Sequence, residues 1–463
     1  MTNTITRFAP SPTGNLHVGS ARTALLNFIV SKQESASKLY LRIEDTDKIR
    51  SKQEFTQNII EGLQWLGINW EKEVQIQSER ISRHKEIANF LLKNNFAYKC
   101  ICSEDKLNKK RDLIRVNKEL SKKICTDCKN KKEIQNLSDG FVVRIKLPDS
   151  GELKINDDIQ GEIVVQNKEL DDFILLRKDQ TPTYMLSVVV DDNDLDVNFI
   201  IRGDDHLNNT FRQYYIYKYL NWNIPKYAHV PLIHGEDGAK LSKRHGAVDI
   251  LDFKKNGYLK EAIVNNLILL GWSPGNKSEI INIDEIIKVF KIDKLSKSSS
   301  IFSYKKLNFF NNHYLRSSIG KKEFENFCQM NTKLKKNFLE NKDKMFKIFE
   351  VYKKDLTNLK EIFDIVDIYF DKNFKSKSDE KFGEDFDDIL VEFKEEISKI
   401  EKWTRENLQK KIEDFLHKKN IKFPVLGKPI RFLLINSYNG PSISDIFVIL
   451  GKKDSLDRLN QYI

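Results

Sequence analysis

The spacing of apolar residues changes several times along the chain, and each spacing predicts a kind of element. Apolar runs at Thr4–Phe8 and Leu39–Ile43 predict buried strands. Apolar residues recur every three or four positions in Ala21–Ser31 and Glu54–Leu66, which predicts helices. Because strand, helix, strand and helix follow one another, the N-terminal part is predicted to be an α/β domain with a parallel sheet and crossover helices.

This regular alternation stops after residue 71. The stretch Tyr98–Leu137 is Lys-rich and helical in pattern. Beyond it, short runs rich in β-branched residues lie between Asp, Asn and Gly turns and predict strands at Phe141–Ile145, Glu162–Val165, Phe173–Leu176 and Leu186–Val190. Residues 72–190 are therefore expected to form an α+β insertion into the parallel-sheet domain, which would comprise residues 1–71 and 191–239.

From residue 240 the pattern is helical to the end of the chain. Apolar residues stand three and four positions apart in segments such as Leu259–Leu270, Ile283–Phe290, Lys342–Tyr352, Ile389–Ile397 and Arg405–Phe415. The charged run Asp371–Lys381 is expected to be a solvated helix face or loop. We expect two all-α parts, residues 240–320 and residues 321–463.

The composition excludes a disordered chain and a small disulfide-stapled module. Of 463 residues, 40% are hydrophobic and 31% charged, so a core spread over several domains is expected. The net charge of +11 indicates a polyanionic partner such as nucleic acid, unless the Lys-rich composition reflects codon bias. No apolar run is long enough to span a bilayer, and Met1–Arg7 lacks the apolar stretch of a signal peptide, so a cytoplasmic protein without a membrane role is expected.

Four of the five cysteines lie close together in the sequence. Cys100-x-Cys102 and Cys125-x-x-Cys128 offer four soft ligands at a spacing suited to a tetrahedral structural Zn²⁺. The alternative is four unligated thiols in an intracellular protein. Cys328 stands alone on a helical stretch and is expected to pack in the core.

Two polar segments stand out for nucleotide chemistry. Ala9–Ser20 lies between a predicted strand and a predicted helix, where free N–H groups attract phosphate. About 220 residues later, Lys240–Arg244 forms a compact basic segment. Taken alone, each has an ordinary explanation, namely a strand-to-helix turn with an incidental His and a surface charge cluster.

Together, the two segments resemble the paired nucleotide-binding signatures of class I aminoacyl-tRNA synthetases. Two further stretches, Arg7–Gly14 and Leu41–Asp47, resemble the bacterial glutamyl-tRNA synthetase family. Shorter matches continue through the chain at Pro182–Tyr184, Val189–Asp192, Ile201–Gly203, Leu269–Trp272 and Leu450–Lys452. The resemblance covers essentially the whole chain.

This resemblance implies a Rossmann-type parallel-sheet catalytic domain, with residues 72–190 as an inserted acceptor-binding domain. It also implies a helical domain at 240–320 that carries the second signature loop and contacts the tRNA stem, and an α-helical anticodon-binding domain at 321–463. Some members of the family hold zinc in the insertion, although their second ligand pair ends differently from Cys125-x-x-Cys128.

The activity that the resemblance implies is ATP-dependent attachment of L-glutamate to tRNA through glutamyl-adenylate, with Mg²⁺ accompanying ATP. The implied ATP-binding residues are Pro10, Ser11, His17, Gly19, Ser20, Leu232, Lys240, Ser242 and Lys243. Of these, His17, Lys240 and Lys243 would be catalytic, because they would hold phosphates and neutralise the charge that develops in the transition state.

Glutamate carries two carboxylates and one ammonium, so its pocket needs groups of both charges, and a guanidinium binds a carboxylate through paired hydrogen bonds. By resemblance, the glutamate-binding residues are Arg7, Ala9, Ser11, Glu44, Tyr184 and Arg202. Arg7, Tyr184 and Arg202 would bind the side-chain carboxylate, and Glu44 the ammonium. Taken singly, each could also be an ordinary salt-bridge or strand-end residue.

Two further polar positions are less specific. His206 lies near the family's adenosine-facing positions. The cluster Asp191–Asp194 would by itself be compatible with a metal, but we expect a loop that follows a strand.

The resemblance also implies tRNA-Glu as a partner, and a monomer. The helical tail would read the anticodon, with Trp403 and Phe432 available for stacking on bases, although most aromatics of the tail are expected in the core. Where discriminating members carry Arg, this chain has Asp355. Charging of tRNA-Gln as well as tRNA-Glu, or in preference to it, therefore stays open, and a separate amidotransferase would then follow.

Two interpretations belong to other classes of protein. One is a tRNA-independent nucleotidyltransferase on the same fold, against which the long helical tail argues. The other is a non-catalytic tRNA-binding protein, against which His17, Lys240, Lys243 and the pocket arginines argue.

Overall fold

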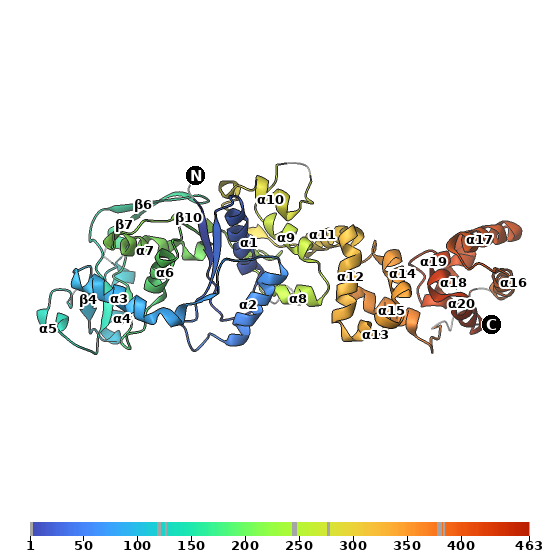
Figure 1. Cartoon of the computed structure of the whole chain (residues 1–463), viewed down its shortest axis with the longest axis horizontal. Coiled ribbons are helices and arrows are strands. Elements are labelled where there is room, and N and C mark those ends of the chain that lie inside the picture. The colour runs from blue at the N-terminus through green and yellow to red at the C-terminus, as the bar shows by residue number, and fades with distance from the viewer. Residues whose placement is uncertain are drawn as a thin grey trace. The chain divides into compact units, whose positions relative to one another are not determined.

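The structure is a computed structural model (Figure 1). It describes residues 3–117, 122–125, 127–242, 248–275, 278–376, 382 and 385–462. The chain forms two compact units, one of residues 1–254 and 260–307 and the other of residues 255–259 and 308–463. The first unit carries the sheets, and the second is helical.

Two sheets of mainly parallel strands form the centre of the first unit. One has the order β1 (Ile5–Phe8), β2 (Lys38–Ile43), β3 (Gln75–Ile76). In the other, β10 (Lys226–Val230) lies between the parallel strands β9 (Phe199–Gly203) and β6 (Glu152–Asp157), and β7 (Gly161–Gln166) adds an antiparallel edge.

The two sheets join at β1 and β9. These strands contact each other, and the Asn198 amide donates a hydrogen bond to the Ile5 carbonyl over 3.2 Å. The start of β1 therefore lies beside the start of β9, which makes the two strands parallel. The resulting order is β3-β2-β1-β9-β10-β6-β7, so the carboxyl ends of the parallel strands share one edge.

Helices cover this sheet as the apolar patterns predicted. The helix α1 (Val18–Lys32) contacts β1, β2 and β9 on one side and α9 (Lys260–Ile268) and α10 (Ile283–Val289) on the other. Because it is enclosed, most of its residues are buried. By contrast, α2 (Gln53–Trp65) buries one stripe that contains Ile59 and Leu63. All four elements predicted in residues 4–66 are confirmed.

The predicted insertion contains a three-stranded antiparallel sheet of β4 (Ala97–Cys100), β5 (Val142–Ile145) and β8 (Ile174–Leu176). Its helices are α3 (Ile81–Lys93), α4 (Glu104–Val116) and α5 (Lys132–Gln135). Its apolar residues share one hydrophobic core with β9, β10 and α7 (Leu207–Tyr219). The insertion thus packs as one body with the parallel sheet, and the four-part division of the chain stays a prediction.

The prediction of a strand at Leu186–Val190 is wrong. This run lies in α6 (Tyr184–Asp194), where it is buried against α3, α7 and β8. A short apolar run buried on all sides has no helical periodicity, so it cannot be distinguished from a buried strand. Accordingly, Asp191–Asp194 is the last turn of a helix and not a loop after a strand.

After residue 240, the part of the chain that belongs to the first unit is mostly helical. The prediction of helix alone after residue 240 is wrong at one point, because β12 (Ser300–Ile301) pairs in parallel with β11 (Ile233–His234). A two-residue strand is too short to leave a periodic signal. Of the helices here, α8 (Ile250–Lys255) follows the second signature segment.

The second unit consists of helices that bury one apolar face each. They are α11 (Tyr304–Arg316, which begins in the first unit), α12 (Ser318–Met330), α13 (Thr332–Glu340), α14 (Lys342–Tyr352), α15 (Ile362–Phe370), α16 (Phe386–Ser398), α17 (Arg405–Lys419), α18 (Phe423–Ile435), α19 (Ile443–Leu450) and α20 (Lys452–Asn460). As expected, Cys328 on α12 is buried. Among the residues described, no helix has the length and apolar character needed to cross a membrane.

Candidate active site

A cavity of about 480 Å³ opens at the carboxyl ends of the parallel strands. Its walls come from residues at the ends of β1, β2, β9 and β10 and from the start of α1. In open parallel sheets, ligands bind at this edge where the strand order reverses. Here the order reverses between β1 and β9, and the cavity lies at that junction.

Most of the predicted site residues line this cavity. They are Arg7, Ala9, Pro10, Ser11, His17, Gly19, Ser20, Glu44, Tyr184, Arg202, Leu232 and Lys240. Ser242 does not line it, although its neighbour Leu241 does. Lys243 lies outside the described residues. The weaker candidate His206 also lines the cavity.

His17 caps the N-terminus of α1. Its Nδ1 accepts a hydrogen bond from the Gly19 amide over 3.2 Å. Burial, and then the charge of Lys240, lower the pKa of His17 against the opposing effect of Asp249. A neutral ring that accepts at Nδ1 carries its proton on Nε2, and the ring also has a hydrogen bond with the Leu241 backbone at the cavity wall.

The two signature segments meet at the cavity. The Val18 amide donates to the Val248 carbonyl over 2.9 Å, so the chain that follows the basic segment lies along the start of α1. The basic segment itself begins in a hairpin that closes where the Leu241 amide donates to the Ile233 carbonyl over 3.0 Å. The fold therefore brings Lys240 to the same cavity as His17, as the pairing of the motifs predicted.

Arg202, at the end of β9, is 5% exposed. Its Nη1 donates to the Tyr184 hydroxyl over 3.4 Å, and its Nη2 donates to Thr210 Oγ1 over 2.7 Å and to the His206 carbonyl over 3.3 Å. The second Nη1 hydrogen has no acceptor among the described residues. Because Arg202 lines the cavity, this hydrogen is available to an anionic ligand.

Tyr184 begins α6 and connects Arg202 to His206. Its hydroxyl lies 2.9 Å from His206 Nδ1. Burial raises the pKa of Tyr184, so the phenol stays neutral and can donate. Burial, followed by the charge of Arg202, lowers the pKa of His206 to about 4, so its Nδ1 can accept that proton.

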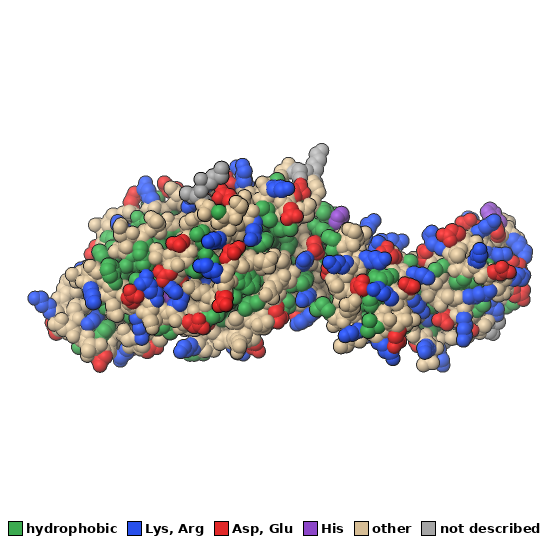
Figure 2. Space-filling model, viewed as in Figure 1, with side chains coloured by type: hydrophobic (Ala, Val, Ile, Leu, Met, Phe, Trp, Pro, Cys, Tyr) green, Lys and Arg blue, Asp and Glu red, His purple; other side chains and the backbone are tan. Residues whose placement is uncertain are grey.

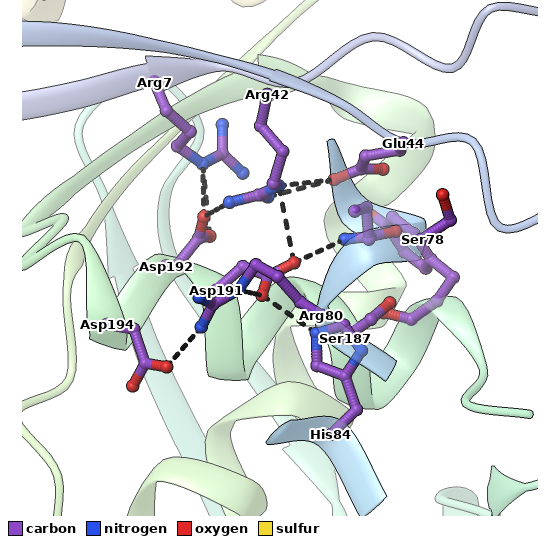
Figure 3. Close-up of polar contacts among 12 residues, drawn as sticks. Arg7, Arg42, Glu44, Ser78, Arg80, His84, Ser187, Asp191, Asp192 and Asp194 are labelled. Carbon is purple, nitrogen blue, oxygen red and sulfur yellow. Dashed lines mark hydrogen bonds and ion pairs between the residues drawn. The ribbon is translucent and has the colours of Figure 1, made fainter. Parts of the chain in front are cut away.

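Arg7 is oriented by a buried ion pair, which Figure 3 shows between the end of β1 and the end of α6. Its Nε lies 3.1 Å from both carboxylate oxygens of Asp192. Neither Nη group has an acceptor in the part of the chain that the structure describes. The ion pair therefore holds the guanidinium and leaves both Nη groups for a ligand.

Arg42 connects this ion pair to Glu44 (Figure 3). It is fully buried on β2, with Nη1 2.6 Å from Asp192 and Nη2 2.9 Å from Glu44 Oε1. Glu44 Oε2 has no donor among the described residues. Burial raises the pKa of Glu44, and Arg42 opposes this by stabilising the ionised form. The free oxygen of Glu44 suits a cationic ligand group.

Ion pairs and hydrogen bonds also connect the end of α6 to residues at and just before the start of α3. Asp191 accepts from Arg80 Nε over 2.6 Å and lies 2.8 Å from His84 Nε2. Asp194 pairs with Arg80 and Arg83. The carboxylates that raised the question of a metal are therefore bound by cationic and hydrogen-bonding side chains of this chain.

Sequence reasoning missed several residues around the cavity, although a signal for them exists. Arg42 and Arg22 each interrupt an apolar element, and a buried charge requires partners. Arg22 lines the cavity and donates to the Pro231 carbonyl over 2.9 Å and to the Leu270 carbonyl. Burial lowers the pKa of Arg22 to about 10.

The four clustered cysteines come together as predicted. All four Sγ atoms lie within 4.8 Å of one another, and Cys102 Sγ is 3.6 Å from Cys125 Sγ and 3.5 Å from Cys128 Sγ. Four thiolates at about 2.3 Å from a tetrahedral zinc stand about 3.8 Å apart. The donor set and its spacing therefore fit Zn²⁺.

The comparisons with known proteins agree with this geometry. The family described as tRNA synthetases class I (E and Q), catalytic domain, matches residues 3–309, and an anticodon binding domain matches residues 326–463. Among curated relatives, the chain is 41% identical to glutamate–tRNA ligase 1 of Rickettsia canadensis, over 99% of each chain. It is 42% identical to glutamate–tRNA ligase 1 of Ehrlichia canis, over 98% of this chain and 97% of that one.

A solved structure of a glutamate tRNA ligase is also similar to this chain. The glutamate tRNA ligase of Elizabethkingia meningosepticum, crystallised in complex with its amino acid, is 27% identical with a TM-score of 0.86 over 99% of both chains. The likeness therefore extends through the catalytic and the anticodon-binding regions. The chain belongs to the family of class I tRNA synthetases for glutamate and glutamine, on the bacterial glutamyl side.

Proposed function

We propose that the chain is a glutamate–tRNA ligase, which uses ATP to attach L-glutamate to tRNA through glutamyl-adenylate. One observation carries this proposal: a single cavity is lined by both nucleotide signature segments and by Arg7, Arg202 and Glu44. The full-length likeness to curated glutamate–tRNA ligases supports the same activity.

ATP occupies the side of the cavity next to α1. Class I synthetases use ATP with Mg²⁺, which balances part of the phosphate charge. Here His17, Gly19 and Ser20 at the start of α1 hold the phosphates. Lys240 and Lys243 neutralise the charge that develops on the phosphoryl oxygens. The remaining ATP contacts are Pro10, Ser11, Leu232 and Ser242.

Glutamate lies against the ion-pair network. Its side-chain carboxylate binds the two free Nη groups of Arg7 and the free Nη1 hydrogen of Arg202, and its ammonium binds Glu44 Oε2. Tyr184 lines the same pocket, where its hydroxyl accepts from Arg202. Ala9 and Ser11 line the same pocket. This arrangement leaves the α-carboxylate free to attack the α-phosphate of ATP, which releases pyrophosphate and forms the adenylate. The glutamyl group then passes to the 2′-hydroxyl of the terminal adenosine of tRNA.

A structural Zn²⁺ is proposed for Cys100, Cys102, Cys125 and Cys128. When bound, the metal would link β4 to the segment before α5, where little hydrophobic core exists to hold the chain. Cys100, Cys125 and Cys128 are buried and Cys102 is partly buried, which suits a closed structural site.

The tRNA partner contacts residues 72–190 with its acceptor end and residues 321–463 with its anticodon. We propose tRNA-Glu as the tRNA substrate. Because Asp355 stands where discriminating relatives carry a positive charge, the alternative is an enzyme that charges tRNA-Gln as well, or in preference. The protein acts as a monomer in the cytoplasm, where its substrates are.

Aminoacylation with radiolabelled glutamate tests this function, using purified tRNA-Glu and tRNA-Gln in separate reactions. We expect charging of tRNA-Glu, and Arg202→Ala should raise the KM for glutamate far more than the KM for ATP. Charging of neither tRNA, with glutamate-dependent use of ATP retained, would instead favour a tRNA-independent nucleotidyltransferase. If Arg202→Ala affected the KM values for glutamate and ATP equally, the proposed role of Arg202 in binding glutamate would be wrong.

A further inference from the structure

His229 lies directly beside Arg202 but outside the cavity. The two residues are cross-strand partners in the parallel pair β9–β10. The Arg202 Nε–H donates to His229 Nε2 over 3.2 Å. His229 is fully buried and does not line the cavity, so it can affect a ligand only through Arg202.

Asp157 determines which nitrogen of His229 can accept. Asp157 ends β6, on the other side of β10, and its Oδ2 lies 2.6 Å from His229 Nδ1. Its Oδ1 accepts from the amides of Ile159 and Gln160 at 3.0 and 2.8 Å, and these bonds favour the ionised carboxylate. An ionised carboxylate only accepts, so Nδ1 carries the ring proton and Nε2 presents a lone pair to Arg202.

Thr210 completes the support from α7. Its Oγ1 accepts from Arg202 Nη2 over 2.7 Å and lies 3.1 Å from His229 Nε2. Four of the five N–H groups of Arg202 are thus bound by neutral protein acceptors: His229, Thr210, His206 and Tyr184. This arrangement fixes the plane of the guanidinium and directs the remaining Nη1 hydrogen to the ligand.

We propose that Asp157 and His229 are positioning residues for glutamate recognition, which hold the Arg202 guanidinium through the Nε2 lone pair of His229. This inference rests on the proposed role of Arg202 in binding the side-chain carboxylate. It assigns a task in the amino-acid site to β6, a strand of the segment predicted to serve the tRNA acceptor end. Neither residue touches substrate.

Variants of His229 separate the roles of its two ring nitrogens, Nδ1 beside Asp157 and Nε2 beside Arg202. The Asn amide in His229→Asn can still donate to Asp157 but does not reach Arg202, whereas Gln in His229→Gln can offer an oxygen near the Nε2 position. We expect His229→Asn to raise the KM for glutamate about tenfold, as for the loss of one charge-assisted hydrogen bond, with the KM for ATP within about twofold of wild type. His229→Gln should recover part of the loss.

A matched control lies on the same strand. Tyr227 is also buried on β10 and stacks on His229, but its hydroxyl has no partner among the described residues. Tyr227→Phe should leave both KM values unchanged. Asp157→Asn should raise the KM for glutamate as His229→Asn does, because a neutral amide no longer enforces the Nδ1–H tautomer.

The assay is steady-state aminoacylation at saturating tRNA, with thermal melting of each variant. If Arg202→Ala raises the KM for glutamate but neither His229→Asn nor Asp157→Asn does, the positioning role is wrong and the role of Arg202 stands. If Arg202→Ala has no selective effect, the proposed glutamate site itself fails. If a variant changes the KM values for glutamate and ATP equally, the role of His229 is structural only. The same conclusion follows if the KM for glutamate of His229→Gln is no lower than that of His229→Asn. Should His229→Asn not fold, His229→Gln and Asp157→Asn still decide the question.

Discussion

Arg7 and Arg202 are both buried at strand ends, but their charges are balanced differently. Arg7 shares the carboxylate of Asp192 with Arg42, whereas Arg202 forms hydrogen bonds and has no ion pair among the described residues. A buried cation without an anion is costly until a carboxylate binds. The residue with the unpaired charge is therefore the one that gains most from an acidic substrate.

Asp192→Asn tests the importance of the network for stability. Asp192 is fully buried and pairs with two guanidiniums, so the variant leaves two buried cations with less compensation. We expect the free energy of unfolding of the first unit to fall by about 3–5 kcal/mol, measured by urea denaturation. Asp47→Asn, which removes an exposed ion pair with Arg50, is the control and should change stability much less. Similar losses in both variants would contradict the assignment.

We expect His206 to make the stability of the first unit depend on pH. Burial and the charge of Arg202 lower its pKa to about 4, whereas in the unfolded chain the pKa is near 6.5. Between these values the unfolded state binds more protons, so lowering the pH from about 6.5 to about 4 reduces stability. His206→Gln should show a smaller fall in Tm across this range. If the fall in Tm were the same in His206→Gln as in the wild type, groups other than His206 would determine the pH dependence.

At the scale of elements, α6 organises the site from both of its ends. Its first residue, Tyr184, contacts Arg202, and its last turn supplies Asp192 to Arg7. The prediction of a strand here placed Asp191 and Asp192 in a loop and so missed the network.

The proposed zinc site lies within one segment of the chain, so we expect loss of the metal to affect that segment alone. We expect metal analysis to find about one Zn²⁺ per chain, and Cys128→Ser to lose it and to speed hydrogen exchange around α4 and α5. Cys328→Ala is the matched control, because Cys328 is a buried cysteine in the other unit and should leave the metal content unchanged. A metal-free and fully folded wild-type protein would refute the site.

For the whole molecule, charge bears on the tRNA partner. Figure 2 shows Lys and Arg side chains over the visible face of each unit, interspersed with Asp and Glu, within a net charge of +11. Contacts to phosphates spread over such a surface release counterions when they form. The surface is therefore suited to bind an extended polyanion through many weak contacts.

We accordingly expect tRNA binding to weaken steeply with salt. Between about 50 and about 200 mM salt, the Kd for tRNA-Glu should rise by more than about tenfold. The KM for glutamate at saturating tRNA should change much less, since the proposed glutamate pocket is lined by buried residues and screened less by ions. A filter-binding titration measures the first quantity and aminoacylation the second. A Kd that does not change with salt would argue against phosphate contacts as the main source of affinity.

Local patterns along the chain were enough to predict the elements with clear periodicity, the paired signature segments, the clustered cysteines and the helical second unit. These features depend on residues near one another in sequence or on a motif with its own chemistry. The partners of buried charges were decided only by the tertiary structure. The pairing of Arg7 with Asp192, and of His229 with both Asp157 and Arg202, depends on which strands and helices lie side by side. Residues so far apart in sequence leave no local spacing that reveals such contacts.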